Sequence, residues 1–175
     1  ELGTIAAAVG IVAEFLARQT DIQQLLRTSP DLRQTAVDEI LRLEAPLIAN
    51  RRRTTRTVTM QGRTIPTDEP VTILWPAAQR DPLAIPDPTV FRLDRNPHDN
   101  LVYGRGPHYC PGEGLARLEL GVLLDELLHT LPGFSPITGV APMRAVYPAG
   151  GFTEVRITLR TAGAESLAPL GGDAA

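Results

Sequence analysis

The sequence predicts a mainly α-helical fold with small β-sheets. Three long stretches carry apolar residues at helical spacing, over residues 1–18, 30–43 and 111–131. Between the last two, residues 50–75 alternate threonine with apolar and basic residues, which is typical of strands. Sixteen prolines and fifteen glycines, most of them between residues 60 and 150, indicate irregular structure around these elements.

The N-terminal helices follow from apolar spacing and from capping residues. A helix over residues 1–18 would bury one face, made of Ile5, Ala8, Val9, Val12 and Leu16. A shorter helix over residues 21–27 would turn inward Ile22, Leu25 and Leu26. The run Thr28–Asp31 predicts a helix start, because a hydroxyl cap, a first-turn proline and an early acid all favour one. This third helix would end before Pro46 and would bury Leu32, Ala36, Val37, Ile40 and Leu41.

Strands and an irregular segment are expected next. Gln61 and Gly62 supply a turn inside the alternating segment, and residues 71–75 read as a further strand. Residues 77–100 are rich in proline and aspartate and are predicted to form a loop.

The C-terminal part combines one helix with short strands. A helix behind residue 111 would end at Pro132 and would present a wide apolar stripe, made of Leu120, Leu123, Leu124, Leu127, Leu128 and Leu131. Short strands are expected over residues 134–160, with residues 155–159 as the clearest. We expect residues 161–175, which are small and polar, to be a disordered tail.

The composition limits the classes of function. A net charge of −3 gives no nucleic-acid signature, and the basic residues between 51 and 56 lack interleaved aromatic residues. No apolar run reaches membrane-spanning length, and one cysteine excludes an internal disulfide. We therefore expect a cytoplasmic protein that binds neither nucleic acid nor membrane. The chain opens inside a helical pattern without a methionine, which indicates a fragment or a processed chain.

The segment from Tyr103 to Glu119 holds the single cysteine, Cys110, in a glycine-rich setting just before a predicted helix. A lone cysteine is most often an inert apolar residue. A cysteine that binds a metal must be a thiolate, and the free N–H groups and dipole of a helix N-terminus favour such an anion. Gly104 and Gly106 would let the backbone pass close to a flat ligand. The combined pattern favours a metal ligand over an inert thiol.

This segment resembles the haem-binding loop of the cytochrome P-450 family, with the pattern aromatic-Gly-x-Gly-x-His-x-Cys-x-Gly. The matching residues are Tyr103, Gly104, Gly106, His108, Cys110 and Gly112, with tyrosine in place of the usual phenylalanine. The resemblance implies the C-terminal half of that fold, so that residues 1–160 would be a single partial haem-binding domain. It also implies haem b as cofactor, with the Cys110 thiolate as axial ligand of the iron.

Glu39 and Arg42 lie three residues apart and therefore share a helix face. Taken alone, they read as a solvated pair worth about 0–1 kcal/mol. The resemblance implies instead a buried Glu-x-x-Arg pair that holds the loop before the cysteine and does no chemistry. The family often completes this pair with a further arginine, and Val90 stands at that position, which leaves Arg92 or Arg95 as substitutes.

The resemblance assigns four further roles. Arg52 and His108 would hold the haem propionates, since an arginine fork can bind a carboxylate with two hydrogen bonds. Thr4 falls on the threonine that relays protons to bound oxygen. Gly3 replaces the usual acid beside it, so the relay would use Thr4 alone, or Glu1 and water. Residues 150–152, and above all Gly151 and Phe152, are candidates for the substrate pocket.

The implied function is that of a bacterial-type haem-thiolate monooxygenase, of which this chain would be the haem-ligating portion. Such an enzyme inserts one oxygen atom into a small organic substrate. Its electrons would come from NAD(P)H through a ferredoxin and a ferredoxin reductase. The alternative is a truncated relative that binds haem or a protein partner without oxygenating a substrate.

Overall fold

The computed structural model describes residues 2–160, so the tail expected over residues 161–175 lies outside the described part. The helices of that part are α1 (Leu2–Arg18), α2 (Thr20–Thr28), α3 (Arg33–Glu44), α4 (Trp75–Ala78) and α5 (Glu113–Thr130). Short 3₁₀ turns lie at η1 (Pro30–Leu32), η2 (Pro97–Asp99) and η3 (Gly106–His108).

The strands form two-stranded antiparallel ladders, so the predicted class of helices with small sheets is confirmed. One ladder pairs β1 (Ala49–Arg53) with β4 (Pro70–Leu74), and a second pairs β2 (Val58–Met60) with β3 (Arg63–Ile65). The other two pair β5 (Phe134–Pro136) with β8 (Ile157–Leu159) and β6 (Met143–Arg144) with β7 (Phe152–Glu154).

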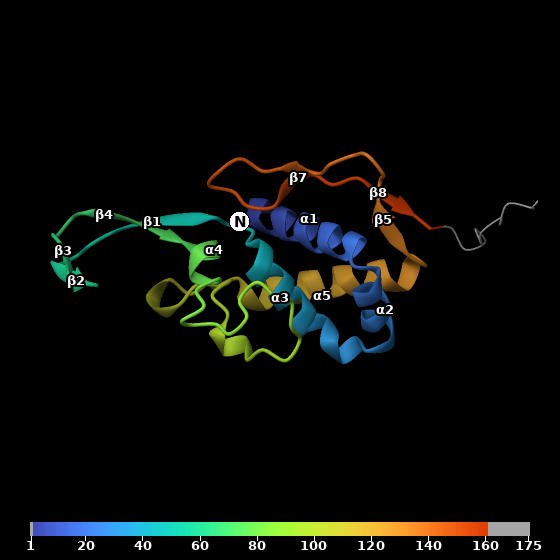
Figure 1. Cartoon of the computed structure of the whole chain (residues 1–175), viewed down its shortest axis with the longest axis horizontal. Coiled ribbons are helices and arrows are strands. Elements are labelled where there is room, and N and C mark those ends of the chain that lie inside the picture. Colours follow the sequence, from blue (N-terminus) through green and yellow to red (C-terminus); the bar gives the residue numbers. More distant parts are fainter. Residues whose placement is uncertain (1, 161–175) are drawn as a thin grey trace, which may run out of the picture.

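Helices α1, α3 and α5 pack together in the body of the molecule (Figure 1). Their apolar stripes meet in one core, in which fully buried side chains include Val12, Leu16, Ile40, Leu120 and Leu124. The apolar spacing of the sequence therefore predicted the inward faces of these three helices.

Helix α2 departs from the expected pattern. Leu25, which was expected to be buried, is 37% exposed, whereas Gln23 is 3% exposed. The Gln23 side-chain amide donates to the backbone carbonyls of Leu16, at 2.7 Å, and Phe134, at 2.8 Å. A buried polar side chain is stable when it is hydrogen-bonded. Through these two bonds Gln23 links α2 to α1 and β5 within the core.

The third helix also begins later than predicted. Pro30 opens the 3₁₀ turn η1, α3 starts at Arg33, and Ser29 makes no capping hydrogen bond through its side chain. The helix ends at Glu44, before Ala45 turns the backbone to a φ of 44°.

The ladder of β1 and β4 extends from the body as an arm, with β2 and β3 at its tip (Figure 1). Gln61 and Gly62 have φ values of 48° and 75° and make the tight turn that their types predicted. The strand expected to end at Trp75 stops one residue earlier, because Trp75 begins α4.

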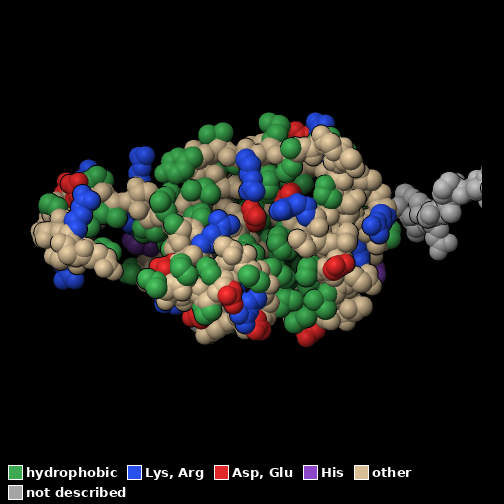
Figure 2. All heavy atoms as spheres, viewed as in Figure 1, with side chains coloured by type: hydrophobic (Ala, Val, Ile, Leu, Met, Phe, Trp, Pro, Cys, Tyr) green, Lys and Arg blue, Asp and Glu red, His purple; other side chains and the backbone are tan. Residues whose placement is uncertain are grey.

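Basic and acidic side chains are interspersed over the face of the molecule in Figure 2. That face therefore offers no concentrated surface of one sign. Within residues 2–160, none of the helices combines the length and the apolar character that crossing a bilayer requires.

Candidate functional site

Cys110 lies between η3 and α5 with a partly exposed side chain, outside the apolar core. Its N–H donates to the Tyr103 carbonyl at 2.8 Å, which closes the loop around it. Helix α5 begins at Glu113 with Gly112 as its N-cap, and the Glu113 N–H donates to the Cys110 carbonyl at 3.3 Å. Pro111, expected inside that first turn, lies before it. The Cys110 side chain thus lies, partly exposed, just before a helix N-terminus.

The glycines of this loop are explained by its turns and by the space they leave. Gly104 and Gly106 have φ values of 74° and 70°, in the left-handed region that favours glycine. A Cβ built on Gly104 would lie 3.3 Å from the His108 carbonyl oxygen, and one on Gly112 would lie 3.8 Å from the Cys110 sulfur. A side chain at Gly112 would therefore reach the space beside the sulfur.

We expect Gly104→Ala to lower the free energy of unfolding by about 1–2 kcal/mol, because a left-handed alanine is strained. The added methyl group would also crowd the His108 carbonyl. Urea denaturation would measure the change. Gly114→Ala is the matched control, since Gly114 lies in α5 and its added Cβ would meet no atom within 4 Å. Equal stability of the Gly104→Ala variant and the parent chain would contradict this account.

Glu39 and Arg42 form the buried ion pair that the resemblance implied, and not a solvated surface pair. They are 4% and 2% exposed, and two hydrogen bonds of 2.6 and 2.9 Å join the Arg42 guanidinium to the Glu39 carboxylate. Arg42 also donates to the backbone carbonyls of Gln79 and Pro88, both at 2.8 Å. The pair therefore ties α3 to the irregular segment that precedes the cysteine loop.

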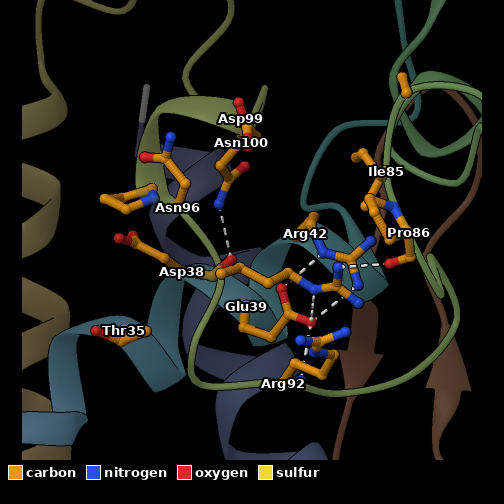
Figure 3. Close-up of a pocket in the computed structure, with 13 residues that line it drawn as sticks. Thr35, Asp38, Glu39, Arg42, Ile85, Pro86, Arg92, Asn96, Asp99 and Asn100 are labelled. Atoms are coloured by element: carbon orange, nitrogen blue, oxygen red, sulfur yellow. Dashed lines mark hydrogen bonds and ion pairs between the residues drawn. The ribbon is translucent and has the colours of Figure 1, made fainter.

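Arg95 completes this cluster, which settles the alternative that the sequence left open. Its Nε lies 2.9 Å from Glu39 Oε1, and its side chain is 13% exposed. Arg92 contributes only its backbone N–H to the same oxygen, because its guanidinium pairs with Asp94 at 2.8 Å. In Figure 3 the Glu39 carboxylate lies between Arg42 and Arg92.

A cavity of about 210 Å³ lies beside this cluster (Figure 3). Asp38, Asn96 and Asn100 line it together with the cluster, and Cys110 does not. The cavity is therefore separate from the predicted cofactor site.

Arg52 lies on β1 and is half-buried, whereas its neighbours Arg51 and Arg53 are exposed. Alternate residues of a strand point the same way, so Arg52 shares a face with Asn50. The Asn50 side chain accepts a hydrogen bond of 2.7 Å from the Trp75 indole, and a Cβ built on Gly104 would lie 3.9 Å from that ring. This face of β1 thus leads to the cysteine loop, and propionate binding by Arg52 stays a prediction.

The side chains of Thr4, on the first turn of α1, and His108, at the end of η3, are exposed. A Cβ built on Gly3 would meet no atom within 4 Å. Glu1 lies outside the described residues. The roles of Thr4 and His108 therefore stay predictions.

Residues 150–152 are packed against the N-terminal helices. A Cβ on Gly150 would lie 2.0 Å from the Ala45 carbonyl oxygen, and one on Gly151 would lie 3.0 Å from Ile11. Phe152 is 8% exposed, with the Arg144 guanidinium 4.3 Å from its ring centroid. Packing explains these residue types, and a place for Gly151 and Phe152 in a substrate pocket stays a prediction.

Sequence reasoning missed two amides that join the irregular segment to the cysteine loop. Gln79, 1% exposed, donates to the Asn100 side chain at 2.8 Å, and Asn100 donates to the Asp38 carbonyl at 3.0 Å. The Asn100 side-chain oxygen also accepts the Val102 N–H at 2.8 Å. No spacing rule marks such loop amides, because their partners are set by the path of the chain.

The Tyr103 hydroxyl is buried and has no hydrogen-bond partner within residues 2–160. Burial, followed by the negative charge of Asp38, raises the pKa of Tyr103 from 10.0 to about 12. The folded chain therefore keeps this proton at a pH at which the unfolded chain releases it.

We expect Tyr103→Phe to flatten the pH dependence of stability between about pH 10 and 12. In this window folded Tyr103 holds its proton while the unfolded chain loses it, so the parent chain loses stability as the pH rises. Phenylalanine cannot ionise, so the variant lacks this loss. Urea denaturation of both proteins across the window would measure the difference, and parallel curves would refute the prediction.

A sequence model described as "Cytochrome P450" matches residues 12–135. The chain belongs to the cytochrome P450 family. It is 39% identical over 124 residues to "Cytochrome P450 144" of Mycobacterium tuberculosis, a match that covers 70% of this chain and 29% of that protein. It is 45% identical over 117 residues to the beta-dihydromenaquinone-9 omega-hydroxylase of Mycobacterium bovis, which covers 66% of this chain and 24% of that protein.

Solved P450 structures share the fold. Cytochrome P450 CYP150A6 of Mycobacterium marinum, in the substrate-free form, superimposes with a TM-score of 0.85 at 31% identity. That match covers 92% of this chain and 42% of the solved chain. This P450 chain therefore spans less than half the length of the relatives it matches, and corresponds to the C-terminal portion of the fold.

Proposed function

We propose that this chain is the haem-ligating portion of a P450 monooxygenase. The observation that carries the proposal is the setting of Cys110, a partly exposed cysteine between a glycine-turned loop and the N-terminus of α5. The residues present fit a haem. The donor is a cysteine, Gly112 places no side chain beside the sulfur, and a Cβ built on Gly106 would meet no atom within 4 Å.

Each residue has a defined part in holding the cofactor. Cys110 would ligate the haem iron as a thiolate, with its charge favoured by the N–H groups that open α5. Arg52 and His108 would bind the propionates, and the planar guanidinium of Arg52 suits a carboxylate. Haem ligated in this way supplies oxygen activation, because the thiolate pushes electron density toward the iron.

Proton delivery would fall to Thr4, on the first turn of α1. Its hydroxyl can donate and accept hydrogen bonds, which is what a relay requires. With glycine at position 3, the relay would use this hydroxyl alone, or Glu1 and water. Gly151 and Phe152 would lie at the edge of the substrate pocket.

The reaction proposed for the whole enzyme is the insertion of one oxygen atom into a small organic substrate. A hydroxylase among the relatives supports this class of reaction. Electrons would come from NAD(P)H through a ferredoxin and its reductase, and the enzyme would work in the cytoplasm.

A second candidate function is the binding of haem or of another polypeptide without oxygenation of a substrate. The observation in its favour is an exposed apolar row on α5. Leu115, Leu118 and Val122 are 61%, 63% and 53% exposed, at a spacing that puts them on one helix face. Such a face is available to a protein partner.

Spectra of the purified chain after incubation with haem separate these functions. A thiolate-type band on reduction under carbon monoxide would support the haem-ligating function. The absence of any haem signal would favour the second candidate, a chain that binds another polypeptide. Product formation with a ferredoxin and its reductase would then separate an oxygenase from a haem carrier.

A further inference from the structure

Two adjacent acids of α3 point to opposite sides of the helix. Glu39 points toward Arg42 and Arg92, and Asp38 points away from them (Figure 3). Both are buried, at 4% and 5% exposure. Glu39 belongs to the scaffold already described, whereas Asp38 has no part in the function proposed above.

Asp38 forms an ion pair with α5. Its Oδ2 lies 2.7 Å from Nη1 of Arg117, whose Nε lies 2.9 Å from Oε1 of Glu113. Burial raises the pKa of Asp38, and the charge of Arg117 opposes that rise. A buried carboxylate without this partner would be costly, so the pair is held together firmly.

Arg117 continues from this pair to the cysteine loop. Its guanidinium carbon lies 5.2 Å from the ring centroid of Tyr103, within the range of a cation–π contact. The carbonyl of Tyr103 accepts the N–H of Cys110 at 2.8 Å. Contacts therefore run without interruption from Asp38, through Arg117 and Tyr103, to the backbone of Cys110.

Asp38 also holds the start of the same loop. Its backbone carbonyl accepts a hydrogen bond of 3.0 Å from the Asn100 side chain, which in turn accepts the N–H of Val102. Asp38 thus contacts the start of the segment that leads to the cysteine directly, and reaches its far end through Arg117.

We propose that Asp38 and Arg117 are positioning residues for Cys110 and fix its backbone by holding the Tyr103 ring. The inference rests on the proposed function, because the position of Cys110 matters only if its sulfur binds the iron. A second ion pair between the same helices provides a comparison that separates this role from simple contact between helices. Arg33 and Asp125 join the same α3 and α5 at 2.8 Å, and the Asp125 side chain is 57% exposed.

Hydrogen–deuterium exchange of the Cys110 amide, followed by NMR in the chain before haem is added, tests the proposal. We expect Asp38→Asn to accelerate this exchange on the order of tenfold, because Arg117 loses the carboxylate that holds it against the Tyr103 ring. Tyr103→Leu removes the ring beneath Arg117 and should accelerate the exchange as well. Asp125→Asn, the matched control, breaks the exposed pair on the same helices and should leave the exchange unchanged.

After haem is added, the Asp38→Asn variant should form less thiolate-type carbon monoxide complex than the Asp125→Asn variant. Unchanged exchange in Asp38→Asn, or equal acceleration in Asp125→Asn, would overturn the proposal. If the Asp38→Asn variant does not fold, the Tyr103→Leu variant provides the test. Unchanged exchange of the Cys110 amide in that variant would overturn the proposal. Failure of the parent chain to bind haem would count against the proposed function. The exchange results would still test whether Asp38 and Arg117 position Cys110.

Discussion

Replacement of Cys110 by serine is expected to abolish the thiolate-type band of the reduced, carbon-monoxide-bound chain. Serine is close to cysteine in size, and the side chain is only partly buried, so the fold should survive. The hydroxyl does not supply the thiolate that ligates iron and donates electron density to it. The absorbance spectrum of the haem-loaded variant would measure the loss, and circular dichroism would establish that the helices persist.

Tyr109→Phe is the matched control for this substitution. Tyr109 is the neighbour of Cys110 and is 47% exposed, so its hydroxyl can be removed without touching the sulfur. The control should keep the thiolate-type band. A band of unchanged intensity in the Cys110→Ser variant would place the iron on another ligand and would remove the basis of the proposed function.

Glu39→Ala should give the largest loss of stability, about 3–5 kcal/mol in the free energy of unfolding. The substitution leaves the buried Arg42 guanidinium without its carboxylate, and it removes the partner of Arg95 as well. Because these arginines hold the segment before the cysteine loop, we also expect the variant to be purified without haem. Urea denaturation and haem content would measure the two effects.

The exposed pair between Arg33 and Asp125 provides the comparison for this loss. Asp125→Ala should cost about 0–1 kcal/mol, as expected for an ion pair with a solvated carboxylate. Normal haem content in the Glu39→Ala variant would refute the scaffold role of the pair, even if the stability fell.

The local sequence pattern predicted the features that depend on residues close together in the chain. Apolar spacing identified the buried faces of α1, α3 and α5, and Gln61 and Gly62 marked their turn. The sequence also placed Glu39 and Arg42 on one face, since residues three apart on a helix are neighbours. Spacing alone did not reveal their burial, which only the family resemblance implied, because burial depends on the distant carbonyls of residues 79 and 88.

The side chains that the sequence misplaced or overlooked depend on contacts across long separations. Gln23 is buried because β5 offers it a carbonyl, and Leu25 is displaced toward solvent on the same helix. Arg95 and Arg92 were equivalent candidates until the path of the irregular segment brought one guanidinium to Glu39. Asp38 gave no sequence signal, because its partner Arg117 belongs to another helix.

Apart from the Glu39 carboxylate, the two arginines of the scaffold bind main-chain carbonyls. Arg42 donates to the carbonyls of Gln79 and Pro88, and Arg95 donates to those of residues 86, 87 and 90. Every amino acid offers the same carbonyl, so this stretch can tolerate substitution while its path is kept. Val90, at the position where the resemblance implies an arginine, contributes only its carbonyl, which accepts from Arg95 at 2.9 Å. Loop grafting between relatives should therefore succeed here when the backbone length is matched and Arg95 is kept, because its side chain still has to reach Glu39.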